Sequence, residues 1–282
     1  MVERKRERWE QVAKFLRNLG WILFSFAVVA LGVETVVCAR LPGDSVGDNY
    51  PVIPVIPWLP AIPFIAFALG SVVTISGIGL LLRRTRPLAS VVVGCYFFTG
   101  ALVLCLPRYA VNLGSMPLRT GVFEPLSLAA LAFLMSGIAP IWLVRVSRYA
   151  LGLSLVVFGV DHLIAVMPIA SLVPKWIPGR PFWVAFFGVV FIAAGLSIWL
   201  KSLEFWAASG LGLMFASWVC TLHLPRVLGI YHIPGAPQNP NEWGSLFIAI
   251  ALWGGPWVLA GRTAPEVAEG QPSSMIPQRV PV

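Results

Sequence analysis

The sequence has very few charged residues. Of its 282 residues, 11% are Asp, Glu, Lys or Arg, whereas soluble globular domains contain about 25%. Hydrophobic residues make up 58% of the chain, and the mean hydropathy is +0.83. This composition excludes a soluble enzyme, a disordered chain and a coiled coil, and it predicts an integral membrane protein.

Several motifs that would indicate chemistry are missing. The sequence has no phosphate-binding loop, no His-Glu-x-x-His, no Cys-x-x-Cys-His and no Gly-x-Ser-x-Gly, and no apolar run carries paired histidines for two haems. The four cysteines, Cys38, Cys95, Cys105 and Cys220, form no Cys-x-x-Cys pair, and we expect them to be buried as small apolar side chains. We therefore expect no metal site, no haem and no independent catalytic activity.

The net charge of +8 does not indicate nucleic-acid binding, because the basic residues lie in short clusters between apolar runs. Loops that face the cytoplasm are enriched in Lys and Arg in membrane proteins, which explains such clusters better. The expected partner of this surface is the lipid bilayer.

Eight apolar runs divide the chain. They span residues 21–39, 61–82, 88–106, 126–144, 150–169, 182–200, 205–224 and 243–260. Each is close to the ~20 residues with which a helix crosses the hydrocarbon core. Lipid leaves backbone groups no partners outside the segment, and the alternating ~10-residue segments of a barrel are absent. The runs predict an all-α, polytopic membrane helix bundle with eight transmembrane helices.

Two polar segments flank these runs. Residues 1–20 are basic and carry Trp9, Val12, Leu16 and Leu19 at helical spacing, which predicts an amphipathic helix on the membrane surface. Residues 262–282 are rich in Pro, Ser and Gln, which predicts a disordered cytoplasmic tail.

The basic residues also predict the orientation. With eight spans both termini share one side, and fourteen of the 20 Lys and Arg residues fall on that side. The other six are Arg40, Arg108, Arg119, Lys175, Arg180 and Arg226. The asymmetry predicts a multi-pass protein of the cytoplasmic (inner) membrane, with both termini cytoplasmic.

The chain matches itself at a shift of 118 residues. Matched pairs include Trp58 and Trp176, Gly70 and Gly188, Gly77 and Gly195, Gly94 and Gly212, Arg108 and Arg226, Glu124 and Glu242, and Gly137 and Gly255. The first helix of each half matches at a shift of 127, which aligns Glu34 with Asp161. We expect two four-helix repeats, residues 21–145 and 146–261. Since each has an even number of spans, they are parallel and related by an axis along the membrane normal.

A small set of polar residues gathers near the outer ends of the spans. In the second half the candidate outer-pocket residues are Asp161, His162, His223, Arg226 and Glu242, and their pseudo-equivalents in the first half are Glu34, Arg108 and Glu124. Ionisable side chains in a span are costly and normally face a partner or a cavity. Two interpretations remain open: a structural ion-pair clamp, and a ligand or proton site. The histidines have no recognisable zinc-ligand spacing.

The helix ends predict how this set is arranged. Asp161 is expected about six residues inside its span, or roughly 9 Å deep. Arg226 is expected to close its helix, because Pro225 would end the helix there. Glu242 is expected to open the next helix and to pair with Arg226, with Asp161 or His162 facing the same cavity. The first half should repeat this arrangement with Arg108, Glu124 and Glu34.

The second half resembles the DoxX-like integral membrane protein family. The likeness rests on Gly-Val-Asp-His (159–162), Val-Pro-Lys-Trp-Ile-Pro (173–178), Phe-Trp (182–183), Gly188 and Gly195, the run 222–229 with Leu-His-Leu-Pro-Arg, and Asn-Glu-Trp (241–243). It covers about residues 150–260, and more faintly 25–140. The family is typically a single four-helix unit associated with a quinol oxidase and with thiosulfate:quinone oxidoreduction, so a tandem duplication departs from it.

The resemblance implies an accessory membrane subunit of a quinone-linked redox or respiratory complex. Its ligand would be a quinone or lipid at the outer-face polar pocket, and its partners would be the other subunits. The alternatives are a small-solute or proton carrier or channel, and a non-catalytic scaffold. The cytoplasmic halves of the spans are almost wholly apolar, which argues against a continuous polar path.

The orientation can be tested by cysteine labelling. A cysteine placed at Gly43 should react with a membrane-impermeant thiol reagent added outside the cell, and one placed at Thr85 should not. The reverse labelling pattern would refute this orientation.

Overall fold

The computed structural model describes residues 2–38, 62–201, 203–230 and 242–263, and within them every regular element is helical. Eight of its helical stretches are long and apolar enough to cross a membrane, which confirms the helix bundle. The long helices are α1 (Val2–Cys38), α2 (Ile62–Leu81), α3 (Arg86–Thr99), α5 (Met116–Ser136), α6 (Ile141–Ile164), α8 (Arg180–Leu200), α9 (Glu204–Trp218) and α11 (Glu242–Ala260). The short ones are η1 (Gly100–Cys105), α4 (Leu106–Ala110), α7 (Val166–Leu172), η2 (Val219–His223) and α10 (Leu224–Val227).

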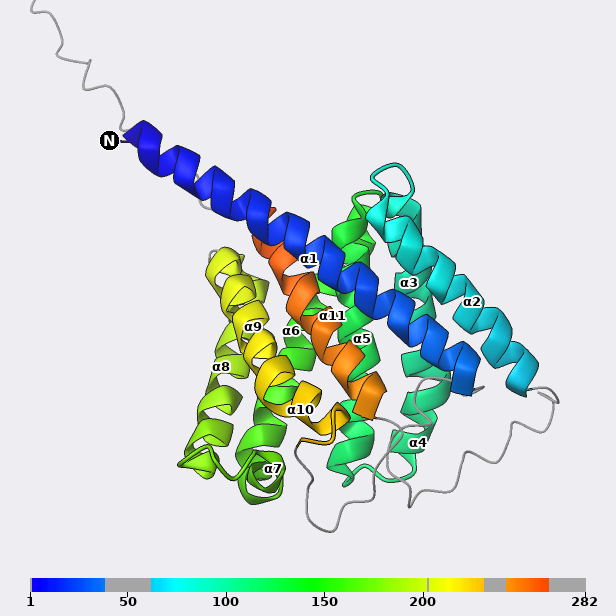
Figure 1. The fold of residues 1–282 in the computed structure, drawn as a ribbon, viewed down its shortest axis with the longest axis vertical. Helices are drawn as coiled ribbons and strands as arrows, with labels where there is room; N and C mark the ends of the chain where they lie inside the picture. Colours follow the sequence, from blue (N-terminus) through cyan, green and yellow to red (C-terminus); the bar gives the residue numbers. More distant parts are fainter. Residues whose placement is uncertain (1, 39–61, 202, 231–241, 264–282) are drawn as a thin grey trace, which may run out of the picture.

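Helices α5 and α11 form the centre of the bundle (Figure 1). In each, 67% of the apolar span is buried inside the protein, against 28–39% in the other spans. The surrounding helices expose large apolar side chains such as Phe64, Phe67 and Ile75 of α2, as expected where the solvent is lipid. We call the end with the start of α3 and the end of α11 the terminal end, and the opposite end the distal end.

The same helix pairing occurs twice. In the first four-helix unit α1 packs on α2, α2 on α3, and α3 on α5; in the second, α6 packs on α8, α8 on α9, and α9 on α11. Between the units, α1 lies along α11 and α6 lies along α5 (Figure 1). The first helix of each unit therefore packs against the fourth helix of the other.

Glycines set the closest approach between the first two helices of each unit. A Cβ atom on Gly159 would stand 2.5 Å from the Gly188 carbonyl oxygen, and one on Gly32 would stand 2.8 Å from the Gly70 carbonyl oxygen. The two crossings occupy the same place in the repeat. Small residues let backbones meet in membrane bundles, where van der Waals contact replaces the hydrophobic effect as the source of association.

The prolines near the distal end do not end their helices, contrary to the sequence prediction. A π-helical segment precedes each of them, η1 before Pro107 and η2 before Pro225. The Leu106 amide bonds to the Ala101 carbonyl, and the Leu224 amide bonds to the Val219 carbonyl, five residues back in both cases. Because proline lacks an N–H, the widened turn lets the chain continue as α4 and α10.

The boundary between the two units differs from the sequence prediction. Composition placed one span at 126–144 and the next at 150–169, but α5 starts at Met116 and α6 at Ile141. The break is at Gly137, which adopts φ +75°, and at Pro140, the residue that precedes α6. Hydropathy does not detect this break, because most of the residues before Gly137 and after Pro140 are apolar.

Two further expectations change. Residues 2–20 are not a separate helix, because α1 runs without interruption from Val2 to Cys38. Of the four free cysteines, only Cys105 is buried; Cys38, Cys95 and Cys220 are exposed on the bundle surface. The predicted tail lies outside the described residues, apart from Arg262 and Thr263.

Replacing Gly159 with alanine should destabilise the bundle by about 1–3 kcal/mol, the usual range for overpacking. Gly210 in α9 is the matched control, because a Cβ there meets nothing within 4 Å. Gly210→Ala should be neutral or stabilising, since alanine is the better helix former. Thermal unfolding in mild detergent measures both, and equal effects would contradict the proposed crossing.

Candidate polar site at the distal end of the bundle

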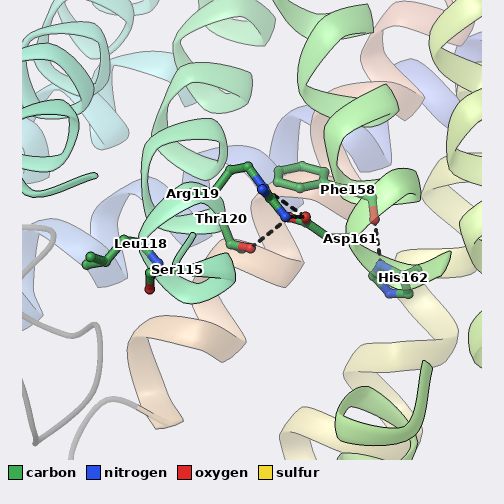
Figure 2. Close-up of polar contacts among 7 residues, drawn as sticks. All are labelled: Ser115, Leu118, Arg119, Thr120, Phe158, Asp161 and His162. Atoms are coloured by element: carbon green, nitrogen blue, oxygen red, sulfur yellow. Dashed lines mark hydrogen bonds and ion pairs between the residues drawn. The ribbon is translucent and has the colours of Figure 1, made fainter. Parts of the chain in front are cut away.

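Asp161, near the end of α6, is the most buried acid of the distal end, with 3% of its surface exposed. The Arg119 guanidinium binds its Oδ1 atom through Nε at 2.8 Å and also through Nη2, while the Thr120 hydroxyl lies 3.4 Å from Oδ2 (Figure 2). Both partners belong to α5 of the other unit. A charge-assisted bond of this kind offsets the cost of burying a carboxylate.

The first turn of α5 presents these partners. Ser115 precedes the helix in an extended conformation, and its hydroxyl accepts the Leu118 amide proton at 3.4 Å. Arg119 is the last residue of the first turn, and Thr120 follows it. Asp161 therefore lies beside a helix N-terminus, where the helix dipole also favours a negative charge.

Sequence reasoning missed Arg119, because it placed that residue in a loop. It also placed Asp161 six residues deep, whereas Asp161 lies in the last turn of α6. The helix breaks at Ala165 (φ −119°, ψ 38°), since Pro168 has no N–H to bond to the Ile164 carbonyl. The start signal that could have placed Arg119 is Ser-Met-Pro at 115–117, a capping residue followed by an early proline.

Glu34 repeats this arrangement in the first unit. It aligns with Asp161 in the repeat, and its half-buried carboxylate accepts a hydrogen bond from the Gly244 amide in the first turn of α11. In both units, an acid at the distal end of the first helix thus contacts the N-terminal turn of the other unit's fourth helix.

Arg226 and Glu242 form the ion pair that the sequence predicts. The pair joins α10 to the start of α11, and both side chains are mostly buried, with 18% and 19% exposed. The second carboxylate oxygen of Glu242 is buried without a hydrogen-bond partner, as is Nδ1 of His223, one turn before Arg226. Such unpaired buried atoms cost about 1–3 kcal/mol each.

The corresponding pair in the first unit is not found. No ion pair between Arg108 and Glu124 occurs in the part of the chain that the structure describes. Glu124 does not open α5, as was expected, but lies in its third turn, because α5 starts at Met116. Pro125 follows it inside the helix.

His162 faces away from Asp161 (Figure 2), and its ring lies in an aromatic cluster. Its ring stacks on Trp218 of α9, with centroids 5.7 Å apart and planes at 16°, and lies 5.3 Å from the Phe191 ring. Its Nδ1 atom is 2.7 Å from the Phe158 carbonyl oxygen. Since a carbonyl can only accept, Nδ1 donates, and neutral His162 carries its lone pair on Nε2.

The predicted pocket residues therefore separate into three contacts. Asp161 belongs to the α5–α6 interface, His162 to the aromatic cluster, and Arg226 with Glu242 to the α10–α11 junction. No group of three His, Cys, Asp or Glu residues suited to a metal ion occurs among the described residues. Whether any of these contacts is a ligand or proton site stays a prediction.

The contact between the units can be measured with a double-mutant cycle on Arg119→Gln and Asp161→Asn. We expect a coupling energy of about 1–3 kcal/mol in the free energy of unfolding, because either change strands a buried partner. SDS titration of the detergent-solubilised protein gives this quantity. Arg145→Gln, at an exposed arginine of α6, should have little effect, and strictly additive single changes would contradict the pairing.

Comparisons with protein-family models, with curated proteins and with solved structures found no match to this chain. Its assignment therefore rests on its own sequence and geometry. Eight apolar spans and a lipid-facing surface of large apolar side chains make it a multi-pass integral membrane protein.

Proposed function

We propose that the chain is a DoxX-like membrane protein that serves as an accessory subunit of a quinone-linked redox or respiratory complex. In this proposal it binds a quinone headgroup beside His162. The observation that carries the proposal is the His162 ring, half-buried and stacked on Trp218 at the distal end of the bundle.

The chemistry of this contact suits a quinone. A quinone ring is flat and apolar on its faces, and its carbonyl or hydroxyl groups need hydrogen-bond partners at the edge. The partly exposed rings of Phe187 and Trp218 provide aromatic surface of this kind near His162, and the buried rings of Phe191 and Phe215 pack behind them. Neutral Nε2 can accept a proton from a quinol hydroxyl, and the protonated ring can donate to a quinone carbonyl.

The surroundings offer a route from the bilayer. Phe182, Trp183 and Phe186 lie one after another on the exposed face of α8, with 64%, 40% and 46% of their surfaces exposed. Trp183 contacts Phe187, which in turn contacts Trp218. A lipid-soluble ligand would meet aromatic side chains continuously from this surface to the histidine.

A carrier for a solute or a proton is supported less well. In the described spans the charged side chains lie toward the two ends of the bundle, and Glu124, the innermost charged residue of α5, is in the third turn of that helix. The middle of each span is apolar or weakly polar. A binding site at one end of the bundle fits this distribution better than a path across it.

The orientation in the membrane is part of the same proposal. We infer that the terminal end faces the cytoplasm and the distal end faces outward, on the strength of the fourteen basic residues on the side of the termini. The histidine would then face quinone in the outer leaflet of the inner membrane.

The experiment is to purify the full chain in mild detergent and to identify co-purifying quinones, lipids and protein subunits by mass spectrometry. His162→Phe keeps a ring for stacking but removes both nitrogen atoms, and should reduce bound quinone about tenfold, the loss expected for one hydrogen bond to a buried histidine. Binding of added decylubiquinone should weaken by the same factor.

Thr35→Val is the matched control, because Thr35 occupies the position of His162 in the first unit. It should leave the quinone content unchanged. Arg226→Gln distinguishes a structural ion pair from a ligand site. If the pair between Arg226 and Glu242 is only structural, this variant loses thermal stability and keeps its bound quinone. Absence of quinone from the parent protein, or equal loss in Thr35→Val, would overturn the proposal.

A further inference from the structure

At the terminal end, each unit has an equivalent backbone carbonyl group that accepts a hydrogen bond from an arginine. The two arginines belong to different helices of the repeat. In the second unit Arg148 of α6 donates to the Ile198 carbonyl of α8 at 3.1 Å. In the first unit the equivalent carbonyl, that of Leu80 in α2, accepts from Nε of Arg86 in α3 at 2.7 Å. The contact is kept, while the residue that makes it has changed.

The charge balance around the two contacts differs. Position 148 aligns with Trp21, and position 204 aligns with Arg86. In the second unit Arg148 is neutralised by Glu204, with Nη1 and Oε2 2.7 Å apart. In the first unit the Arg86 guanidinium lies 4.5 Å from the centre of the Trp21 ring, which attracts a cation but carries no charge to cancel it.

Two more arginines adjoin Arg86. Arg262, just after α11, donates to the Leu134 and Met135 carbonyls at the end of α5. A Cβ atom on its neighbour Gly261 would lie 2.6 Å from Cβ of Arg17 in α1, so these segments are in contact. Arg17 is exposed and lies one helical turn before Trp21. We call Arg17, Arg86 and Arg262 the arginine cluster.

Among the residues that the structure describes, the charged neighbours of Arg262 are positive. Packing lowers the pKa of its guanidinium, and the charges of Arg17 and Arg86 lower the pKa further. No described acid contributes to the shift. Arg86 similarly has Arg83 as its charged neighbour. Like charges that converge at a membrane boundary favour an anion between them.

We propose that the arginine cluster, with Trp21 beside it, binds the phosphate group of an anionic phospholipid. Arg86 and Arg262 are held in place by their bonds to carbonyl oxygens, and Arg17 is free to turn toward the ligand. Guanidinium groups bind phosphate oxygens through paired N–H donors. An indole ring at the same level suits the boundary between headgroups and acyl chains.

The test measures phospholipid binding to the detergent-solubilised full chain by native mass spectrometry. Dioleoyl phosphatidylglycerol should bind more tightly than dioleoyl phosphatidylcholine. Arg17→Gln should weaken phosphatidylglycerol binding about fivefold, the effect of one arginine near an anionic headgroup. Within the described part of the chain, the Arg17 side chain makes no hydrogen bond or ion pair, so this variant should unfold at the temperature of the parent.

The matched control is Arg145→Gln, which removes one exposed positive charge from the same end but in the second unit. It should leave phosphatidylglycerol binding unchanged; an equal loss would reduce the proposal to general surface charge and refute it. No preference for phosphatidylglycerol over phosphatidylcholine would also refute it.

Two further measurements identify the source of the anion. Competition by millimolar inorganic phosphate, lost in Arg17→Gln, would support the phosphate site and extend it to free phosphate. The chain also carries Glu266 and Glu269 just beyond Arg262. If phosphatidylglycerol binds only when both are changed to Gln, the chain's own carboxylates occupy the cluster, and the lipid proposal is wrong.

Discussion

The packing of each unit's first helix against the fourth helix of the other unit is the contact on which the rest of the bundle depends. Helices α1 and α6 lie along α11 and α5, the two most buried spans. Each first helix also meets the second helix of its own unit at a glycine crossing. A four-helix unit by itself would leave one face of its first helix and one face of its fourth helix without their protein partners.

Electrostatics reinforces this exchange at the distal end. Asp161 binds the first turn of α5, and Glu34 binds the first turn of α11. Each acid lies beside a hydrogen-bond donor, the Arg119 guanidinium for Asp161 and the Gly244 amide for Glu34. Each also lies at the positive end of a helix dipole. These interactions offset the cost of placing a carboxylate at the edge of a membrane. They also fix the register of two helices from different units.

Composition and self-comparison predicted the helix bundle, the eight spans and the duplication, because lipid requires long apolar helices and because rare residues such as Arg226 and Glu242 match across the repeat. The break between α5 and α6 was not predictable from hydropathy, since apolar residues surround Gly137 and Pro140. The partner of Asp161 was also missed. The sequence places a residue along its own helix, but pairing with Arg119 depends on which helices of the two units lie side by side.

The prolines show a related limit. Pro107 and Pro225 were expected to end their helices, and the π-helical turns that precede them allow both helices to continue. A missing N–H can be accommodated by a widened turn as well as by termination, and the sequence alone does not distinguish the two. That both units adopt the same solution suggests that the Leu-x-Leu-Pro-Arg stretch itself favours the widened turn.

Joining two units in one polypeptide has a consequence for the arginine caps of the terminal end. In an assembly of two identical chains, any substitution appears twice, so the Leu80 and Ile198 positions would have to share one solution. In the fused chain the Ile198 carbonyl is capped by an arginine paired with an acid, and the Leu80 carbonyl by an arginine beside an indole that has no acid partner among the described residues. Charge is therefore distributed asymmetrically within the plane of the bilayer, and the two sides of the molecule present different surfaces to the surrounding lipids.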